Sequence, residues 1–158
     1  MMKIRCWIVL LIFGLNVSLK AQDYQWGVGV RLGPSAGITA KYSLSDYGYL
    51  DGILHFRWHG MQLTGLYEIH APAFDVNDLY WFYGGGAHLG FWDEPHNHPF
   101  YDDYDSHALI GIDGIIGMEY YIRDIPFTIG LDYKPSLNFF DYFGFFADEL
   151  GITLRYVF

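Results

Sequence analysis

The feature that most constrains the fold of this chain is a two-residue alternation between large apolar side chains and glycine or polar side chains. In the segment 25–32 the apolar positions are Trp26, Val28, Val30 and Leu32. Successive side chains of a β-strand point to opposite faces of the sheet, so the pattern predicts a strand with one apolar face. An α-helix would repeat at 3.6 residues, and glycines interrupt nearly every such segment.

The same alternation recurs along the rest of the chain. Seven further segments carry it: 37–44, 50–58, 61–70, 79–92, 110–122, 127–134 and 149–158. Most of them have the length that a tilted strand needs to cross a bilayer, about 9–11 residues. Eight alternating segments joined by turns predict an all-β fold, an eight-stranded antiparallel up-and-down barrel.

Glycine placement distinguishes two kinds of barrel. A soluble barrel of the lipocalin type turns its apolar face inward, whereas a membrane barrel turns it outward. The apolar face holds only Gly52, Gly65, Gly85 and Gly114, and most other glycines of the segments lie on the mixed face. An eight-stranded barrel has a narrow interior that side chains just fill, so small residues are needed inside. The mixed face is therefore expected inside, which predicts a transmembrane barrel.

Charged residues follow the same face. The following are expected to form a polar network in the lumen: Arg31, Lys41, Asp51, Arg57, Glu68, Asp113, Glu119, Asp132, Lys134, Glu149 and Arg155. Buried charges of both signs normally pair, since an unpaired one is costly. We interpret the set as internal ion pairing that fills the barrel, with catalysis or a proton path as the alternative.

The first residues have the pattern of an export signal. Lys3 and Arg5 precede an apolar run, 7–15, that is short for a membrane helix, and cleavage is expected after Ala21. Residues 1–21 are thus predicted to be a cleaved signal peptide and 22–158 the barrel, with a retained N-terminal helix as the alternative. Removal of three basic residues (Lys3, Arg5 and Lys20) takes the net charge from −9 to −12, which argues against nucleic-acid binding.

The chain ends on an amphipathic strand with a terminal aromatic residue. This strand resembles the assembly signal of bacterial outer-membrane proteins in four residues: Gly151, Leu154, Tyr156 and Phe158. With the eight segments and the export signal, the segment 22–158 resembles the small outer-membrane β-barrel proteins of OmpA/OmpX-like shape. The resemblance implies insertion by the barrel assembly machinery, both termini in the periplasm, and contact with outer-membrane lipid and lipopolysaccharide. It also places the two longest connections, 92–107 and 135–144, outside the cell.

The longer of these connections is the one place where the sequence suggests a metal. A divalent cation could bind to a group of five residues there: His96, His98, Asp102, Asp103 and Asp105. The carboxylates would bind Ca²⁺ or Mg²⁺ weakly, and the histidines would add affinity for a transition metal. The spacing matches no fixed motif, and a hydrated acidic loop is the alternative. No other cofactor is expected.

No motif names a reaction. The outer-membrane lipid A deacylase carries a His-x-Ser pair, which is absent here, and Asp105, Ser106 and His107 are adjacent, so on a strand they would point apart. We expect an integral outer-membrane protein that is non-enzymatic, either structural or surface-interacting. The alternative is a lipid-modifying enzyme of the acyltransferase or deacylase type. Eight strands exclude a wide solute pore but leave a water or proton leak open.

Overall fold

The computed structural model describes residues 24–57, 60–93, 106–139, 143–147 and 149–158. Regular structure in these ranges is entirely β. The strands are β1 (Trp26–Leu32), β2 (Ala36–Ser43), β3 (Gly48–Arg57), β4 (Gly60–Pro72), β5 (Leu79–Asp93), β6 (Ser106–Ile122), β7 (Phe127–Tyr133), β8 (Ser136–Asn138), β9 (Gly144–Phe146) and β10 (Leu150–Val157). Among the described residues there is no helix of the length and apolar character that a membrane crossing requires.

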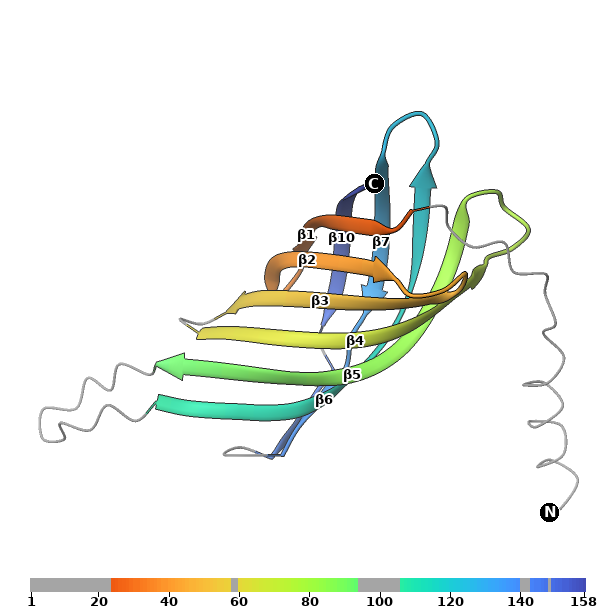
Figure 1. Ribbon diagram of the computed structural model, residues 1–158. Helices are drawn as coiled ribbons and strands as arrows, with labels where there is room; N and C mark the ends of the chain where they lie inside the picture. Colours follow the sequence, from red (N-terminus) through yellow and green to blue (C-terminus); the bar gives the residue numbers. More distant parts are fainter. Residues whose placement is uncertain (1–23, 58–59, 94–105, 140–142, 148) are drawn as a thin grey trace, which may run out of the picture.

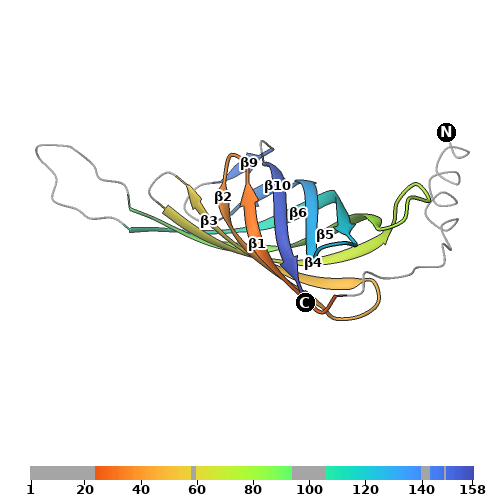
Figure 2. The same cartoon turned by 90° about the horizontal axis from the view of Figure 1, so that it is seen from above.

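The strands form one closed antiparallel ring. Each of β1 to β6 pairs with the next strand in the chain. Strand β7 then pairs with β10, and β10 pairs with β1, which closes the ring. The short β8 follows β7 in the chain and pairs with the same strand, β6. Strand β9 pairs with β8 and precedes β10 in the chain. With β8 counted as the extension of β7 and β9 as the extension of β10, the ten labelled strands form eight strands of a barrel wall. The predicted eight-stranded antiparallel barrel is confirmed (Figures 1 and 2).

Two connections are shorter than the sequence predicted. The expected loop 135–144 contains β8 and the start of β9, and β6 begins at Ser106 rather than at Ile110. Pro135 donates no backbone hydrogen bond and so leaves one gap in the ladder of its strand. Its carbonyl oxygen nevertheless accepts a hydrogen bond from the Gly114 N–H at 2.9 Å, and pairing with β6 resumes at Ser136.

Both ends of the described chain lie at one rim of the barrel. The Trp26 N–H donates to the carbonyl oxygen of Phe158 at 2.9 Å, and the Phe158 N–H donates back to Trp26 at 2.9 Å. We call this end, with the turns 44–47, 73–78 and 123–126, the terminal rim, and the opposite end the distal rim. The sheet coils strongly, since β7 and β10 run steeply across the direction of β2 to β4 in Figure 1.

Side chains alternate between the lumen and the outer surface as the strand period requires. On β10 the side chain of Leu154 is 45% exposed and that of Arg155 only 2%. Several inner glycines are required for closure, because a Cβ on Gly29, Gly37 or Gly86 would run into a carbonyl oxygen of the neighbouring strand. The lumen is therefore filled by side chains and by the wall itself.

Candidate functional site

The lumen holds the chemistry of this molecule, in two clusters of polar side chains. The terminal cluster lies toward the terminal rim and consists of Tyr24, Thr39, Lys41, Asp51, Glu68, His70, Glu119 and Arg155. The distal cluster lies toward the distal rim and consists of Arg31, Ser35, His55, His88, Asp113, Asp132, Lys134, Asn138 and Glu149. All of these side chains are on the inner positions of their strands or adjoining turns, and all are buried.

Lys41 on β2 links two carboxylates of the terminal cluster. Its Nζ lies 2.7 Å from Glu68 Oε2 and 2.9 Å from Glu119 Oε2. The ammonium also sits over the ring of Phe82, 4.6 Å from the centroid, which adds a cation–π contact. Three strands, β2, β4 and β6, are joined through this one side chain.

Arg155 on β10 makes the second crossing of the terminal cluster. It donates from one terminal nitrogen to Asp51 Oδ2 at 2.6 Å and from the other to Glu119 Oε2 at 3.2 Å. The hydroxyl of Thr39 donates to Asp51 Oδ1 at 2.6 Å. Ion pairs of this kind are charge-assisted hydrogen bonds, which are stronger than neutral ones.

Tyr24 closes the terminal cluster at the terminal rim. Its hydroxyl donates to Glu119 Oε1 at 2.7 Å, and its ring packs with Tyr49 and Val157. Burial, together with the neighbouring Glu119 charge, raises the pKa of this phenol well above its usual value. The hydroxyl therefore stays a donor across the physiological range.

Arg31 organises one side of the distal cluster. Its guanidinium contacts Asp132 Oδ1 at 2.6 Å and Glu149 Oε2 at 3.3 Å. The hydroxyl of Ser35 donates to the other oxygen of Glu149. A Cβ on Gly151 would lie 2.5 Å from the Arg31 guanidinium, so glycine there makes room for the pair.

His88 organises the other side. Its Nδ1 lies 2.6 Å from Asp113 Oδ2 and its Nε2 lies 2.8 Å from Asn138 Oδ1. Lys134 approaches the second Asp113 oxygen at 2.8 Å. Both ring nitrogens of the histidine are thus engaged, and β5, β6 and β8 are tied together with Lys134, the residue after β7.

An apolar layer separates the two clusters. Ile53, Leu66, Phe82 and Ile115 form one buried group on the inner face. Along β3 the inner positions run Asp51, Ile53, His55, so the apolar residue lies between members of the two clusters. The lumen is therefore divided: the lumen ion pairs of the described residues form within one cluster or the other, and hydrocarbon lies between the clusters on β3 to β6, whereas Gly29, Gly130 and Thr153 occupy the intermediate inner positions of β1, β7 and β10.

The outer face has the opposite character. It exposes large apolar side chains on each of the eight strands of the barrel wall, for example Val30, Ile112 and Leu131. Aromatic side chains gather toward the terminal rim, where the rings pack in pairs: Trp26 with Tyr42, Trp81 with Tyr83, and Phe127 with Tyr156. Phe56, Phe91 and Phe139 are exposed toward the distal rim.

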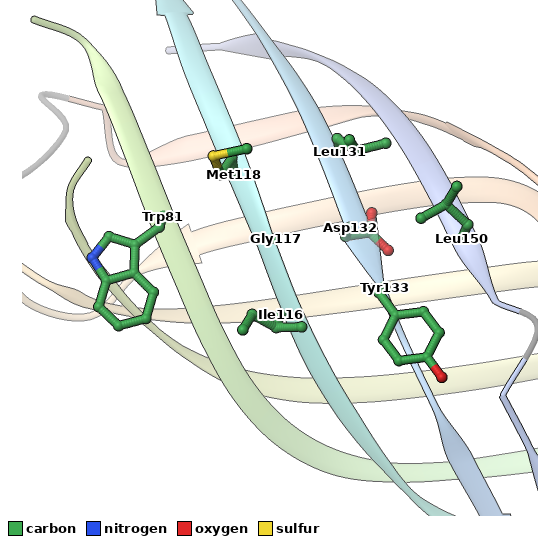
Figure 3. Close-up of a pocket in the computed structure, with 8 residues that line it drawn as sticks. All are labelled: Trp81, Ile116, Gly117, Met118, Leu131, Asp132, Tyr133 and Leu150. Carbon is green, nitrogen blue, oxygen red and sulfur yellow. The ribbon is translucent and has the colours of Figure 1, made fainter. Parts of the chain in front are cut away.

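A shallow apolar hollow interrupts this outer face over β5, β6, β7 and β10 (Figure 3). It has a volume of about 340 Å³, and its walls include Trp81, Ile116, Met118, Tyr133 and Leu150. The large side chains point outward with space between them, as Figure 3 shows for Trp81 and Tyr133. The outer surface is thus rough and presents almost only hydrocarbon here.

Most of the charged residues expected in the lumen lie there. All except Arg57 are buried inside the barrel, and the side chain of Arg57 lies outside the described residues. The expected assembly signal is divided between faces, with Gly151 inside and Leu154, Tyr156 and Phe158 outside. The expected metal ligands His96, His98, Asp102, Asp103 and Asp105 lie outside the described residues, and the remainder of the chain, where described, contains no group of three or more residues placed to hold a metal.

The sequence analysis missed the neutral partners of the network. Thr39, His70 and His88 are polar residues at inner positions of the alternating segments, so the same parity could have identified them. Ser35 and Asn138 had no such signal because they lie in segments that were interpreted as connections.

Comparison with known proteins adds no assignment. No protein-family profile matches this chain, and no curated protein matches it in sequence. The candidate site therefore stands on the geometry of the barrel alone.

Proposed function

We propose that the chain is an integral β-barrel protein of a bacterial outer membrane, with a non-enzymatic structural or surface-interacting role. The observation that carries the proposal is the polarity of the closed wall. Charges are buried in the lumen, while large apolar side chains cover the outer face. A lipid bilayer suits this arrangement, because charged groups are costly in contact with lipid and apolar side chains are not.

The apolar outer face extends around the whole ring, whereas soluble proteins normally confine exposed apolar side chains to small patches. Contiguous exposed apolar patches on monomers are typically about 300–600 Å². Here the exposed aliphatic side chains extend around the ring, from Val28 and Val30 on β1 to Ile152 and Leu154 on β10. Water would solvate such a surface poorly, so it favours either lipid or association.

The dimensions of the barrel also suit a membrane. Strand β3 has 10 residues. At about 3.3 Å per residue and a tilt of about 40°, such a strand spans roughly 25 Å of height, the height of the lipid-facing band in outer-membrane barrels. The packed aromatic pairs toward the terminal rim resemble the girdle that such barrels place at the membrane interface.

The backbone is satisfied as a bilayer demands. Strands β1 and β10 pair over six register positions, from Gly27 with Val157 to Leu32 with Ile152. This closure removes the open edge between the first and last strands, which hydrocarbon could not solvate.

A role without catalysis is supported by how the lumen uses its reactive groups. The hydroxyl of Ser35 donates to Glu149, and both ring nitrogens of His88 face Asp113 and Asn138. Groups held in this way brace the wall. The outer-membrane location, the periplasmic termini and insertion by the barrel assembly machinery are part of the same proposal, which the export-signal pattern of residues 1–21 and the amphipathic pattern of β10 support. Outer-membrane lipid and lipopolysaccharide are the partners we propose.

Fractionation of cells that express the full chain tests the proposal. We expect the protein in the outer-membrane fraction, resistant to carbonate extraction, and with a migration in detergent gels that changes on heating. Recovery as a soluble periplasmic protein would refute the membrane assignment. Incubation of the purified barrel with radiolabelled lipid A tests the non-enzymatic part, and transfer or release of an acyl chain would contradict it.

A further inference from the structure

The terminal cluster carries more negative than positive charge. Its cations are Lys41 and Arg155, and its carboxylates are Asp51, Glu68 and Glu119. These five side chains are at most 2% exposed, so water cannot offset the difference. A net buried charge is among the most costly features that a protein interior can contain.

No further cation faces this cluster from the described residues packed against it. Strand β5 contributes the ring of Phe82, and strand β3 contributes Tyr49. Tyr24 and Tyr121 close the cluster at the terminal rim, and β4 contributes His70 beside Glu68. Arg31, the next cation along β1, is already paired with Asp132 and Glu149 on the far side of the apolar layer.

The three carboxylates are not equally compensated. Glu119 receives hydrogen bonds at both oxygens, from Tyr24 at one and from Lys41 and Arg155 at the other. Asp51 also receives one at each oxygen, from Thr39 and Arg155. Only Glu68 has a buried oxygen, Oε1, without any partner.

His70 lies beside this incompletely paired carboxylate. Its Nε2 is 3.0 Å from Glu68 Oε2, and its Nδ1 is buried without a partner. The imidazole is held between the rings of Tyr49 and Phe82, with centroid distances of 4.3 and 5.0 Å. A titratable ring therefore sits in a fixed position against the excess negative charge.

We propose that the terminal cluster of the folded barrel is a proton-binding site. The cluster holds one proton more than it would with its three carboxylates ionised and its imidazole neutral. The proton belongs to the cluster as a unit, because Asp51, Glu68, Glu119 and His70 interact through the same two cations. Binding it makes the cluster neutral. The described side chains of the distal cluster have no positive charge to supply instead, because Arg31 and Lys134 there face Asp113, Asp132 and Glu149.

The proposal fixes the sign of a pH effect. Above about pH 6.5 the unfolded chain has released the protons of its carboxylates and of His70, so the folded barrel binds one proton more than the unfolded chain. The stability that this proton provides is therefore lost as pH rises from about 6.5 to the pH at which the folded cluster releases it. Within that window the equilibrium constant for unfolding should rise about tenfold per pH unit because of this site.

Glu68→Gln tests the site, because the amide preserves the shape and leaves two cations against two carboxylates. The unfolding of the purified barrel in detergent is measured between pH 4.5 and 8.5 for the wild type and the variant. We expect the slope of the logarithm of the unfolding constant against pH to be smaller by about one in Glu68→Gln. Glu68→Asp, which keeps the charge, is the matched control and should retain the wild-type slope.

An equal slope in Glu68→Gln and the wild type would overturn the proposal. Asp51→Asn gives a second variant with the same change of charge, in case Glu68→Gln does not fold. A measurement on the wild type alone needs no variant: carboxyl ¹³C and imidazole ¹⁵N resonances of the folded barrel are followed against pH. If Asp51, Glu68, Glu119 and His70 all lose their protons at or below the pH values of the unfolded chain, the site does not exist.

Discussion

The inner and outer faces of this barrel differ in how strictly the fold specifies each residue. Gly86 and Gly65 lie on neighbouring strands and on opposite faces. A Cβ on the inner Gly86 would run into the carbonyl oxygen of Gly65, whereas a Cβ on the outer Gly65 would meet nothing within 4 Å. The inner face therefore constrains volume, charge and partner, while the outer face constrains little except polarity.

The largest effect should come from added volume on the inner face. Gly86→Val forces a side chain into the backbone of β4, and we expect it to cost more than about 3 kcal/mol and to prevent most molecules from folding. Gly65→Val, on the outer face one pair away, should fold as the wild type does. Heat-modifiable migration of the two variants measures the folded fraction. A folded Gly86→Val barrel of normal stability would break the comparison.

Removing a lumen charge should have the next largest effect. Arg155→Met leaves Asp51 and Glu119 buried with a single cation between them, and we expect a loss of about 3–5 kcal/mol in unfolding free energy. Arg123 also contacts a carboxylate, that of Asp78, but at the exposed terminal rim. Arg123→Met is thus the control and should leave the urea midpoint unchanged. Equal shifts in both variants would show that burial is not the cause.

Reversing the polarity of the outer face sharpens the comparison, because its effect depends on the solvent. Ile112 is half exposed near the middle of β6. Ile112→Arg should lose roughly 2–4 kcal/mol in lipid if it lies near the midplane. Ile112→Leu should be neutral. Unfolding in vesicles measures both, and a harmless arginine at this position would contradict the membrane assignment.

The smallest effect expected is that of a single neutral donor. Tyr24→Phe removes the hydroxyl that donates to Glu119 Oε1 but keeps the ring that packs with Tyr49 and Val157. A hydrogen bond to a charged group contributes about 1.5–3 kcal/mol, and we expect the lower end because Glu119 retains Lys41 and Arg155. Tyr42→Phe, on the outer face, is the control for loss of a phenol.

The faces and the number of strands could be predicted from the sequence because both follow from local alternation. The ion pairs could not. Arg31 meets Asp132 and Arg155 meets Asp51, across 101 and 104 residues of chain, and these partners depend on how far each strand is staggered against the next. Nothing in the segments themselves fixes that stagger. Strand β8 escaped prediction because Pro135 interrupts one ladder hydrogen bond without ending the pairing.

The pairing of β1 with β10 has a consequence for the order in which the chain acquires structure. Gly27 pairs with Val157, 130 residues further along the chain. Until this pairing forms, the sheet has two unsatisfied edges, each able to pair with another chain. Contacts between residues so distant in sequence form slowly, so the unfinished sheet is the stage most exposed to aggregation. Pairing of β1 with β10 is therefore the contact that removes both edges and ends this risk.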